Sequence, residues 1–180
     1  MANCEDNEFD LAIVDPPYGI IFGDYERYGY KGKEHLTGRY TKKQWDSSIP
    51  KDIYFQELQR VSKNQIVWGG NYFPFLWRNG CKAFIFWFKG NPVENFADGE
   101  LAWTSFDKVA KQFDYRYYGN LQGKSSAEEK IHPTQKPIQL YEWLLINYAT
   151  KGNKVLDTHL GSGSSAIAAY NYKFDFVGLE

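Results

Sequence analysis

Apolar runs and helical patterns alternate along the chain. The run Leu11-Ala12-Ile13-Val14 stops abruptly at Asp15-Pro16-Pro17, which predicts a strand buried on both faces and ended by a forced turn. Comparable runs predict further strands at residues 65–68, 83–88, 101–104, 154–156 and 174–179. Strands that alternate with helices in this way indicate an α/β fold with a mostly parallel sheet and helices on both faces.

Apolar residues at helical spacing predict three helices. The first covers residues 51–63 and is expected to stop at Asn64. The second opens at Pro137 and is expected to end with Gly152 as its C-terminal cap. The third runs through residues 166–170. The apolar side of the second helix is formed by Ile138, Tyr141, Leu144, Leu145 and Tyr148.

The length fits one domain with long loops. A chain of 180 residues can bury one good core but is short for two ordinary domains. We therefore expect a single domain over residues 1–180, with loops at residues 19–45 and 105–130. The first loop is basic and rich in tyrosine, and the second turns Gly- and Ser-rich, which is typical of a mobile surface segment.

The charge balance limits contact with a polyanion to one region. A net charge of −1 argues against a surface that is basic throughout and leaves room for a local patch. The densest basic group lies in residues 19–45, where a solvated loop explains the composition about equally well. This basic group consists of Arg27, Lys31, Lys33, Arg39, Lys42 and Lys43.

Cysteine usage and hydropathy suggest an ordinary cytoplasmic protein. Cys4 and Cys81 lie far apart in the sequence, so neither a disulfide framework nor a metal site is indicated. The longest apolar run, residues 83–88, is far shorter than a membrane span, and residues 1–10 lack the features of a signal peptide. We expect no membrane partner and no metal.

A glycine-rich turn follows the strand predicted at residues 154–156. The heptapeptide Asp157-Thr158-His159-Leu160-Gly161-Ser162-Gly163 opens the third helix, and the next strand leads to the acidic Glu180. Such a unit suits a nucleoside, because glycines let a ligand approach the backbone and the acid can accept hydrogen bonds from ribose hydroxyls. Taken alone, an ordinary strand-to-helix turn explains this segment better. Ser164 to Ala166 stand where a third glycine would fall, which argues against a dinucleotide.

The tetrapeptide Asp15-Pro16-Pro17-Tyr18 is more specific, since chance would produce it in roughly one chain per thousand of this length. An aromatic amine is a poor nucleophile because its lone pair is delocalised into the ring. Two acceptors that hold both amine protons would free that lone pair, and the Asp15 carboxylate and the Pro16 carbonyl can serve as these acceptors. The prolines stiffen the turn, and Tyr18 can stack on the base.

The sequence resembles the beta-class amino-methyltransferases of DNA. The resemblance is carried by four elements in the family's order: the Asp-Pro-Pro-Tyr tetrapeptide, the turn Trp68-Gly69-Gly70-Asn71-Tyr72-Phe73, the element His132-Pro133-Thr134-Gln135-Lys136-Pro137, and the glycine-rich turn. It implies a Rossmann-like methyltransferase fold that binds S-adenosylmethionine, with the catalytic half before the cofactor half. In the family, Asp at the head of the tetrapeptide usually accompanies adenine and Ser usually accompanies cytosine.

The resemblance also implies roles for individual residues. Thr134 and Lys136 would reach the methionine carboxylate of the cofactor, although a Lys at a helix start is ordinarily a solvated surface charge. His132 and His159 are interpreted as loop and turn histidines without a partner. The implied catalytic residues are Asp15, Pro16, Pro17 and Tyr18. The implied cofactor-binding residues are Asp15, Thr134, Lys136, Pro137, Asp157, Gly161, Gly163, Ser164 and Glu180.

The expected function is N6-adenine methylation of double-stranded DNA in a restriction-modification setting, with the target base flipped out of the helix. If the strands before Asp15 and Asp157 are neighbours, they lie about 4.8 Å apart, which sets the methyl donor against the target amine. The two loops, and the basic group of residues 19–45 above all, are expected to contact DNA. Methylation of cytosine N4 or of RNA, and a non-catalytic DNA-binding subunit, stay open as alternatives. A nucleotide-binding oxidoreductase is a distant third, and a homodimer is left open.

Overall fold

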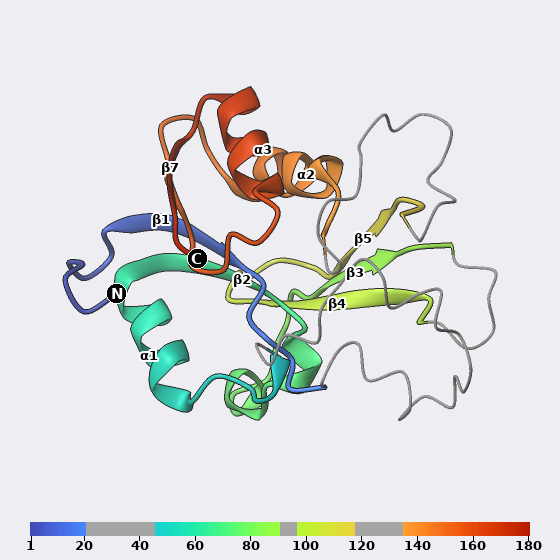
Figure 1. Cartoon of the computed structure of the whole chain (residues 1–180), viewed down its shortest axis with the longest axis horizontal. Coiled ribbons are helices and arrows are strands. Elements are labelled where there is room, and N and C mark those ends of the chain that lie inside the picture. The colour runs from blue at the N-terminus through green and yellow to red at the C-terminus, as the bar shows by residue number, and fades with distance from the viewer. Residues whose placement is uncertain (21–45, 91–96, 118–134) are drawn as a thin grey trace, which may run out of the picture.

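The computed structural model describes residues 1–20, 46–90, 97–117 and 135–180 (Figure 1). The strands in this part of the chain form one seven-stranded sheet in the order β5-β3-β4-β2-β1-β6-β7. Only β4 runs against its neighbours, so the prediction of a mostly parallel sheet is confirmed. The strands are β1 (Phe9–Val14), β2 (Ser62–Trp68), β3 (Ile85–Phe88), β4 (Gly99–Thr104), β5 (Lys111–Asp114), β6 (Lys154–Asp157) and β7 (Asp175–Gly178).

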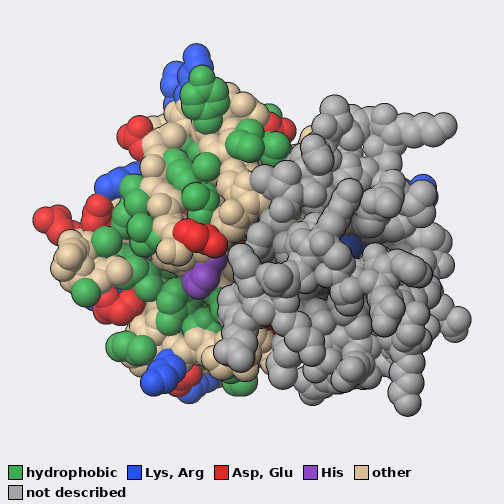
Figure 2. Space-filling model, viewed as in Figure 1, with side chains coloured by type: hydrophobic (Ala, Val, Ile, Leu, Met, Phe, Trp, Pro, Cys, Tyr) green, Lys and Arg blue, Asp and Glu red, His purple; other side chains and the backbone are tan. Residues whose placement is uncertain are grey.

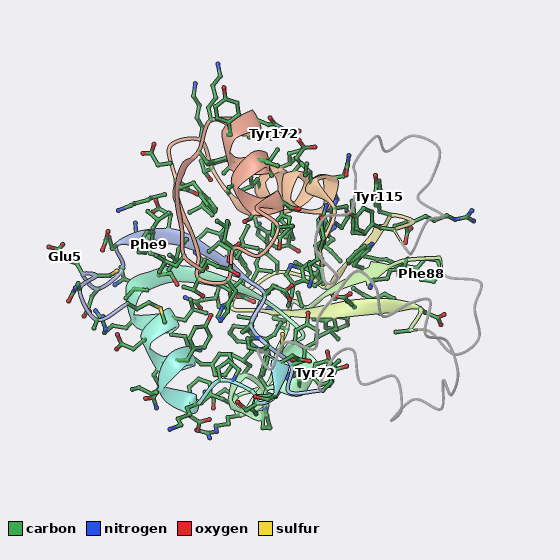
Figure 3. All side chains as sticks on the ribbon, viewed as in Figure 1. Glu5, Phe9, Tyr72, Phe88, Tyr115 and Tyr172 are labelled. Carbon is green, nitrogen blue, oxygen red and sulfur yellow. The ribbon has the colours of Figure 1, made fainter. Side chains whose placement is uncertain are left out.

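Helices cover both faces of this sheet. Figure 1 shows α1 (Asp52–Val61) on one side, and α2 (Ile138–Tyr148) and α3 (Ser164–Tyr172) on the other. Alternate residues of β1 point to the two sides: Leu11 and Ile13 pack in the cluster with α2 and α3, whereas Ala12 and Val14 pack in the cluster with α1. Figure 3 shows side chains filling both spaces. The wholly apolar run of β1 is explained by this burial on two faces.

The helix α3 packs through small side chains. Ala168 and Ala169 are buried against the core, and the larger apolar residues of this helix point outward. Figure 2 shows hydrophobic side chains on the surface over α3. The exposed members are Ile167, Tyr170 and Tyr172.

Two predicted helix ends are wrong. The helix α1 ends at Val61 and β2 begins at the next residue, so Asn64 lies inside the strand. The helix α2 ends at Tyr148, and its C-terminal cap is Ala149 instead of Gly152. Gly152, with φ of +90°, belongs to the turn before β6. The amide of Asn153 there donates to the Thr150 carbonyl, and glycine adopts this left-handed conformation without strain.

The prediction of a loop over residues 105–130 is wrong in its first part. Residues 111–114 form β5, which pairs in parallel with β3 at the edge of the sheet. Phe113 is the one apolar residue of this strand, and it packs against the core. A strand that is exposed along most of its length lacks the alternation of apolar and polar residues that predicts a strand. Residues 118–130 lie outside the described residues.

The segment between β2 and β3 contains two short 3-10 helices, η3 (Gly70–Tyr72) and η4 (Pro74–Trp77). They follow Gly69, which has φ of +66°. Within the described ranges, no helix is both long and apolar enough to cross a bilayer.

Candidate active site

The order of the strands brings the Asp-Pro-Pro-Tyr tetrapeptide and the glycine-rich turn to the same edge of the sheet. The strands β1 and β6 are parallel neighbours, with Leu11 opposite Val155 and Ala12 opposite Leu156. Asp15 and Asp157 therefore stand at the same edge of the sheet. The chain passes from β1 to β2 on one side and returns to β6 on the other, which is the switch point where open α/β sheets bind ligands.

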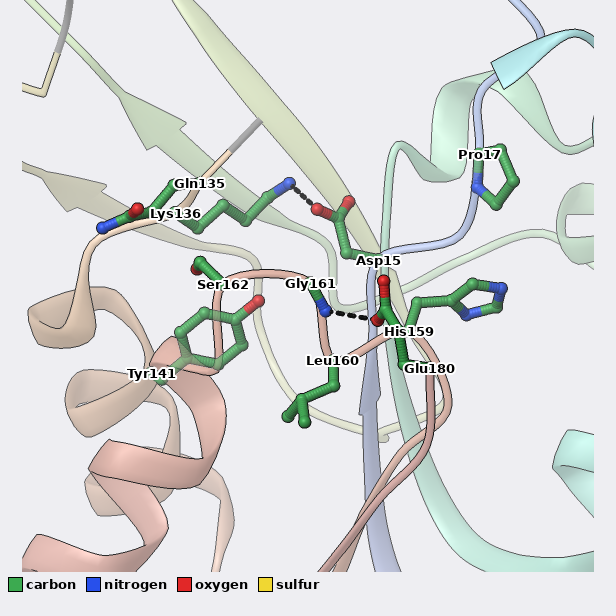
Figure 4. Close-up of a pocket in the computed structure, with 10 residues that line it drawn as sticks. All are labelled: Asp15, Pro17, Gln135, Lys136, Tyr141, His159, Leu160, Gly161, Ser162 and Glu180. Carbon is green, nitrogen blue, oxygen red and sulfur yellow. Dashed lines mark hydrogen bonds and ion pairs between the residues drawn. The ribbon is translucent and has the colours of Figure 1, made fainter. Parts of the chain in front are cut away.

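A cavity of about 180 Å³ opens at this edge (Figure 4). It is lined by five of the residues that were predicted to serve catalysis or cofactor binding, namely Asp15, Pro17, Lys136, Gly161 and Glu180. The remaining lining residues are Gln135, Tyr141, His159, Leu160 and Ser162.

The Asp-Pro-Pro-Tyr tetrapeptide is held together by a contact between its first and last residues. The Tyr18 hydroxyl donates a hydrogen bond of 2.7 Å to Oδ1 of Asp15. Its ring stacks on Tyr72 with centroids 4.9 Å apart and covers Gly69, where a Cβ would collide with it. Burial raises the pKa of Tyr18 well above its usual value, so the hydroxyl remains a neutral donor. Tyr18 thus supports Asp15, and Pro16 is buried.

Lys136 is a buried cation held by carboxylates. Its side chain is 4% exposed, and its Nζ lies 2.5 Å from Oδ2 of Asp15 and 3.1 Å from Oε2 of Glu100. Burial lowers the pKa of Lys136, but the charges of the two carboxylates outweigh it and raise that pKa above its usual value. Lys136 is therefore a charged member of the site, and the alternative of a solvated surface charge is wrong.

The glycine-rich turn is held together by Asp157. Oδ1 of Asp157 accepts the backbone N–H of His159 at 2.9 Å, and Oδ2 accepts the Ser165 hydroxyl at 2.6 Å. The residue is 1% exposed, and burial raises its pKa to about 6 despite these hydrogen bonds. Asp157 therefore shapes the turn from inside and does not line the cavity.

The carboxylate of Glu180 lines the cavity beside the glycine-rich turn. Oε2 of Glu180 accepts the N–H of Gly161 at 2.7 Å (Figure 4). Gly163, with φ of +78°, caps the N-terminus of α3, and the hydroxyl of Ser164 pairs with that of Ser162. Gly163, Ser164 and Pro137, which were predicted to bind the cofactor, do not line the cavity.

His159 lines the cavity, although it was not among the predicted site residues. Its Nδ1 lies 3.0 Å from the Thr158 hydroxyl and 3.4 Å from that of Tyr54, so the interpretation without a partner is wrong. Burial lowers the pKa of His159, which favours the neutral ring. The position of His159 inside the glycine-rich turn could have indicated that it lies at the site. Tyr141 was interpreted only as a core residue of its helix, yet it also lines the cavity.

Several predicted site residues lie outside the described residues. They are Thr134 and the whole basic group Arg27, Lys31, Lys33, Arg39, Lys42 and Lys43. Within the described part, no group of three or more metal-ligating side chains is present.

Comparison with known proteins decides the family. The profile of the DNA methylase family matches residues 39–180. The chain belongs to this family. A curated relative, the Type II methyltransferase M2.MboI of Moraxella bovis, is 25% identical over 219 residues, which covers all of this chain and 78% of M2.MboI. Family membership confirms the resemblance inferred from the motifs and argues against an oxidoreductase.

Solved structures show the same fold. The M1.HpyAVI complex with S-adenosylmethionine superposes with a TM-score of 0.55 at 22% identity, covering 97% of this chain and 83% of that one. The cytosine-N4-specific PvuII methyltransferase gives a TM-score of 0.59 at 14% identity, with coverage of 99% and 77%. The Rossmann-like methyltransferase fold is thereby confirmed for this methylase, and its family membership supports S-adenosylmethionine as the cofactor.

Proposed function

We propose that this methylase transfers a methyl group from S-adenosylmethionine to the exocyclic N6 amine of an adenine flipped out of double-stranded DNA. The observation that carries the proposal is the place of Asp15, which lines the cavity and directly follows β1, the neighbour of the strand that leads into the glycine-rich turn. A hydrogen-bond acceptor for the target amine thus lies beside a site for the methyl donor.

The residues of the cavity fit the cofactor. Glu180 stands beside Gly161 at the end of the chain segment that follows β7, where its carboxylate can accept hydrogen bonds from ribose hydroxyls. Lys136 supplies a buried positive charge for the methionine carboxylate. When bound, the cofactor supplies an electrophilic methyl group on a positively charged sulfur.

The catalytic turn then acts on the target amine. The Asp15 carboxylate and the Pro16 carbonyl accept the two amine protons, so the nitrogen lone pair is directed at the methyl group. Methyl transfer would leave the sulfur neutral and the nitrogen positively charged, and the Asp15 carboxylate, which already accepts one of the amine protons, could take that proton and pass it to solvent. Asp15 stabilises that developing charge because it is an anion in a partly buried site.

Cytosine N4 is the second candidate, because PvuII methyltransferase, which has this fold, is specific for cytosine N4. Asp15 at the head of the tetrapeptide favours adenine. The test is to incubate the protein with labelled S-adenosylmethionine and unmethylated DNA or RNA and to digest the product to nucleosides. We expect the label in N6-methyladenine from DNA only. Label in N4-methylcytosine would make cytosine the target base, and label in RNA would make RNA the substrate. The absence of label from every product would favour a non-catalytic subunit.

We place the activity in the cytoplasm of a bacterium or of a phage-infected cell, as part of a restriction-modification system. M2.MboI is a Type II methyltransferase of a bacterium. Cys4 and Cys81 are both free thiols in the structure, which fits a reducing compartment.

A further inference from the structure

Five side chains beside the cavity form a charge cluster that extends beyond the sequence motifs. Its members are Asp15, Tyr18, Lys89, Glu100 and Lys136. Glu100 comes from β4 and Lys89 directly follows β3, so the cluster connects the catalytic turn to the opposite half of the sheet. Neither Glu100 nor Lys89 belongs to a motif that the sequence analysis identified.

Glu100 is the centre of these contacts. Its Oε1 accepts a hydrogen bond from Lys89, and its Oε2 lies 3.1 Å from Nζ of Lys136 and 3.4 Å from the hydroxyl of Tyr18. Burial raises the pKa of Glu100, but Lys136 and Lys89 lower it to about 2. Glu100 is therefore ionised, and two carboxylates balance two ammonium groups in the cluster.

Lys136 is shared unequally between these carboxylates. Its Nζ is closer to Asp15, at 2.5 Å, than to Glu100, at 3.1 Å. Both oxygens of Asp15 are engaged, because Oδ1 accepts the Tyr18 hydroxyl and Oδ2 accepts Lys136. A carboxylate that already holds an ammonium group attracts a neutral amine less strongly, so this ion pair must loosen before Asp15 can hold the target amine well.

We propose that Glu100 is a positioning residue that retains Lys136 when Asp15 turns to the amine of the target base. This inference rests on the proposed function. Without Glu100, the buried ammonium of Lys136 could leave Asp15 only where the methionine carboxylate of the cofactor replaced it, because an uncompensated buried charge is strongly unfavourable. Because Oε2 of Glu100 is already within 3.1 Å of Nζ, a small shift of the Lys136 side chain transfers its charge without exposing it.

Substitutions of Glu100 and of Lys89 should change the strength of the Asp15–Lys136 ion pair in opposite directions. In Glu100→Gln, Asp15 is the carboxylate of the protein that still pairs with Lys136, so the ion pair at the catalytic turn tightens. In Lys89→Met, Glu100 loses its other cation and draws Lys136 away from Asp15. The two substitutions therefore act on the Asp15–Lys136 pair in opposite directions, which a purely structural role of the cluster does not predict.

The test measures kcat for DNA methylation and the Kd of S-adenosylhomocysteine in the full chain. We expect Glu100→Gln to lower kcat about tenfold and to change that Kd less than about threefold. Lys89→Met is expected to keep kcat at or above that of the natural protein. The matched control is Glu57→Gln, which removes a carboxylate paired with Arg60 on the surface helix α1 and should change neither quantity.

Unchanged kcat in Glu100→Gln would overturn the proposal, as would an equal fall in kcat in both variants. If Glu100→Gln does not fold, Lys89→Met decides alone, and a tenfold loss of kcat at unchanged Kd contradicts the proposal. Failure of the proposed function is distinguishable, because then the natural protein itself transfers no methyl group to DNA.

Discussion

The ammonium group of Lys136 lies 2.5 Å from the carboxylate of Asp15, although 121 positions separate the two residues in the sequence. The resemblance implies that Asp15 serves the target amine and is among the cofactor-binding residues, and that Lys136 reaches the methionine carboxylate of the cofactor. Their ion pair couples the two halves of the site, because a group that binds to either residue competes with the other one.

Replacing Asp15 should separate catalysis from cofactor binding. We expect Asp15→Ala to lower methyl transfer at least about a hundredfold, since it removes the charged acceptor for the target amine. The Kd of S-adenosylhomocysteine, measured by calorimetry, should stay within about threefold, because Asp15 is assigned to the target amine and Glu100 still holds Lys136 in place. A large loss of affinity would mean that Asp15 also binds the cofactor, and retained activity would contradict its catalytic assignment.

Gly69 should be needed for the position of Tyr18. Gly69→Ala places a Cβ against the Tyr18 ring at a residue with φ of +66°, whereas Gly80→Ala meets nothing at a residue with φ of +76°. Both variants should lose about 1–2 kcal/mol of unfolding free energy from the left-handed backbone. Only Gly69→Ala should also lose methyl transfer, by about tenfold or more, because Tyr18 must move away from Asp15. Equal activity in the two variants would show that the contact between Tyr18 and Asp15 is dispensable.

The buried carboxyl of Asp157 should give stability a distinct pH dependence. Burial raises its pKa from 3.8 to about 6, so between these values the folded protein holds a proton that the unfolded chain has released. The free energy of unfolding therefore falls as pH rises through this window, by about 3 kcal/mol at most. Asp157→Asn should lack this component. Urea denaturation of both proteins between pH 4 and 8 checks it, and parallel pH curves would contradict the assignment.

The basic group in residues 19–45 remains a sequence-based prediction for DNA contact. Neutralising Lys31, Lys33, Lys42 and Lys43 together should weaken DNA binding and flatten its salt dependence. Each lost phosphate contact should lower the slope of log K against log salt by about 0.9. The measurement is a salt titration of DNA binding for both proteins. An unchanged slope would place DNA elsewhere on the molecule or exclude it as the substrate.

The sequence by itself determined the elements whose signals are local. The apolar run of β1 and the forced stop at Asp15-Pro16-Pro17 lie within seven consecutive residues, and burial on both faces leaves no other common explanation for such a run. The glycine-rich turn carries its own conformational requirement, since Gly161 and Gly163 both have positive φ. The motifs, their order and the family could therefore be inferred before any contact was known.

Only the tertiary structure decided which distant residues meet. Glu100 has no local feature that separates it from a surface acid, and it becomes part of the site because β4 pairs beside β2 and brings it to Lys136. The strand β5 likewise depends on a distant segment, because it shows no alternation of apolar and polar residues and is stabilised by pairing with the free edge of β3. Ion pairs and edge strands depend on the order of strands in the sheet, and that order is fixed by packing between segments far apart in the chain.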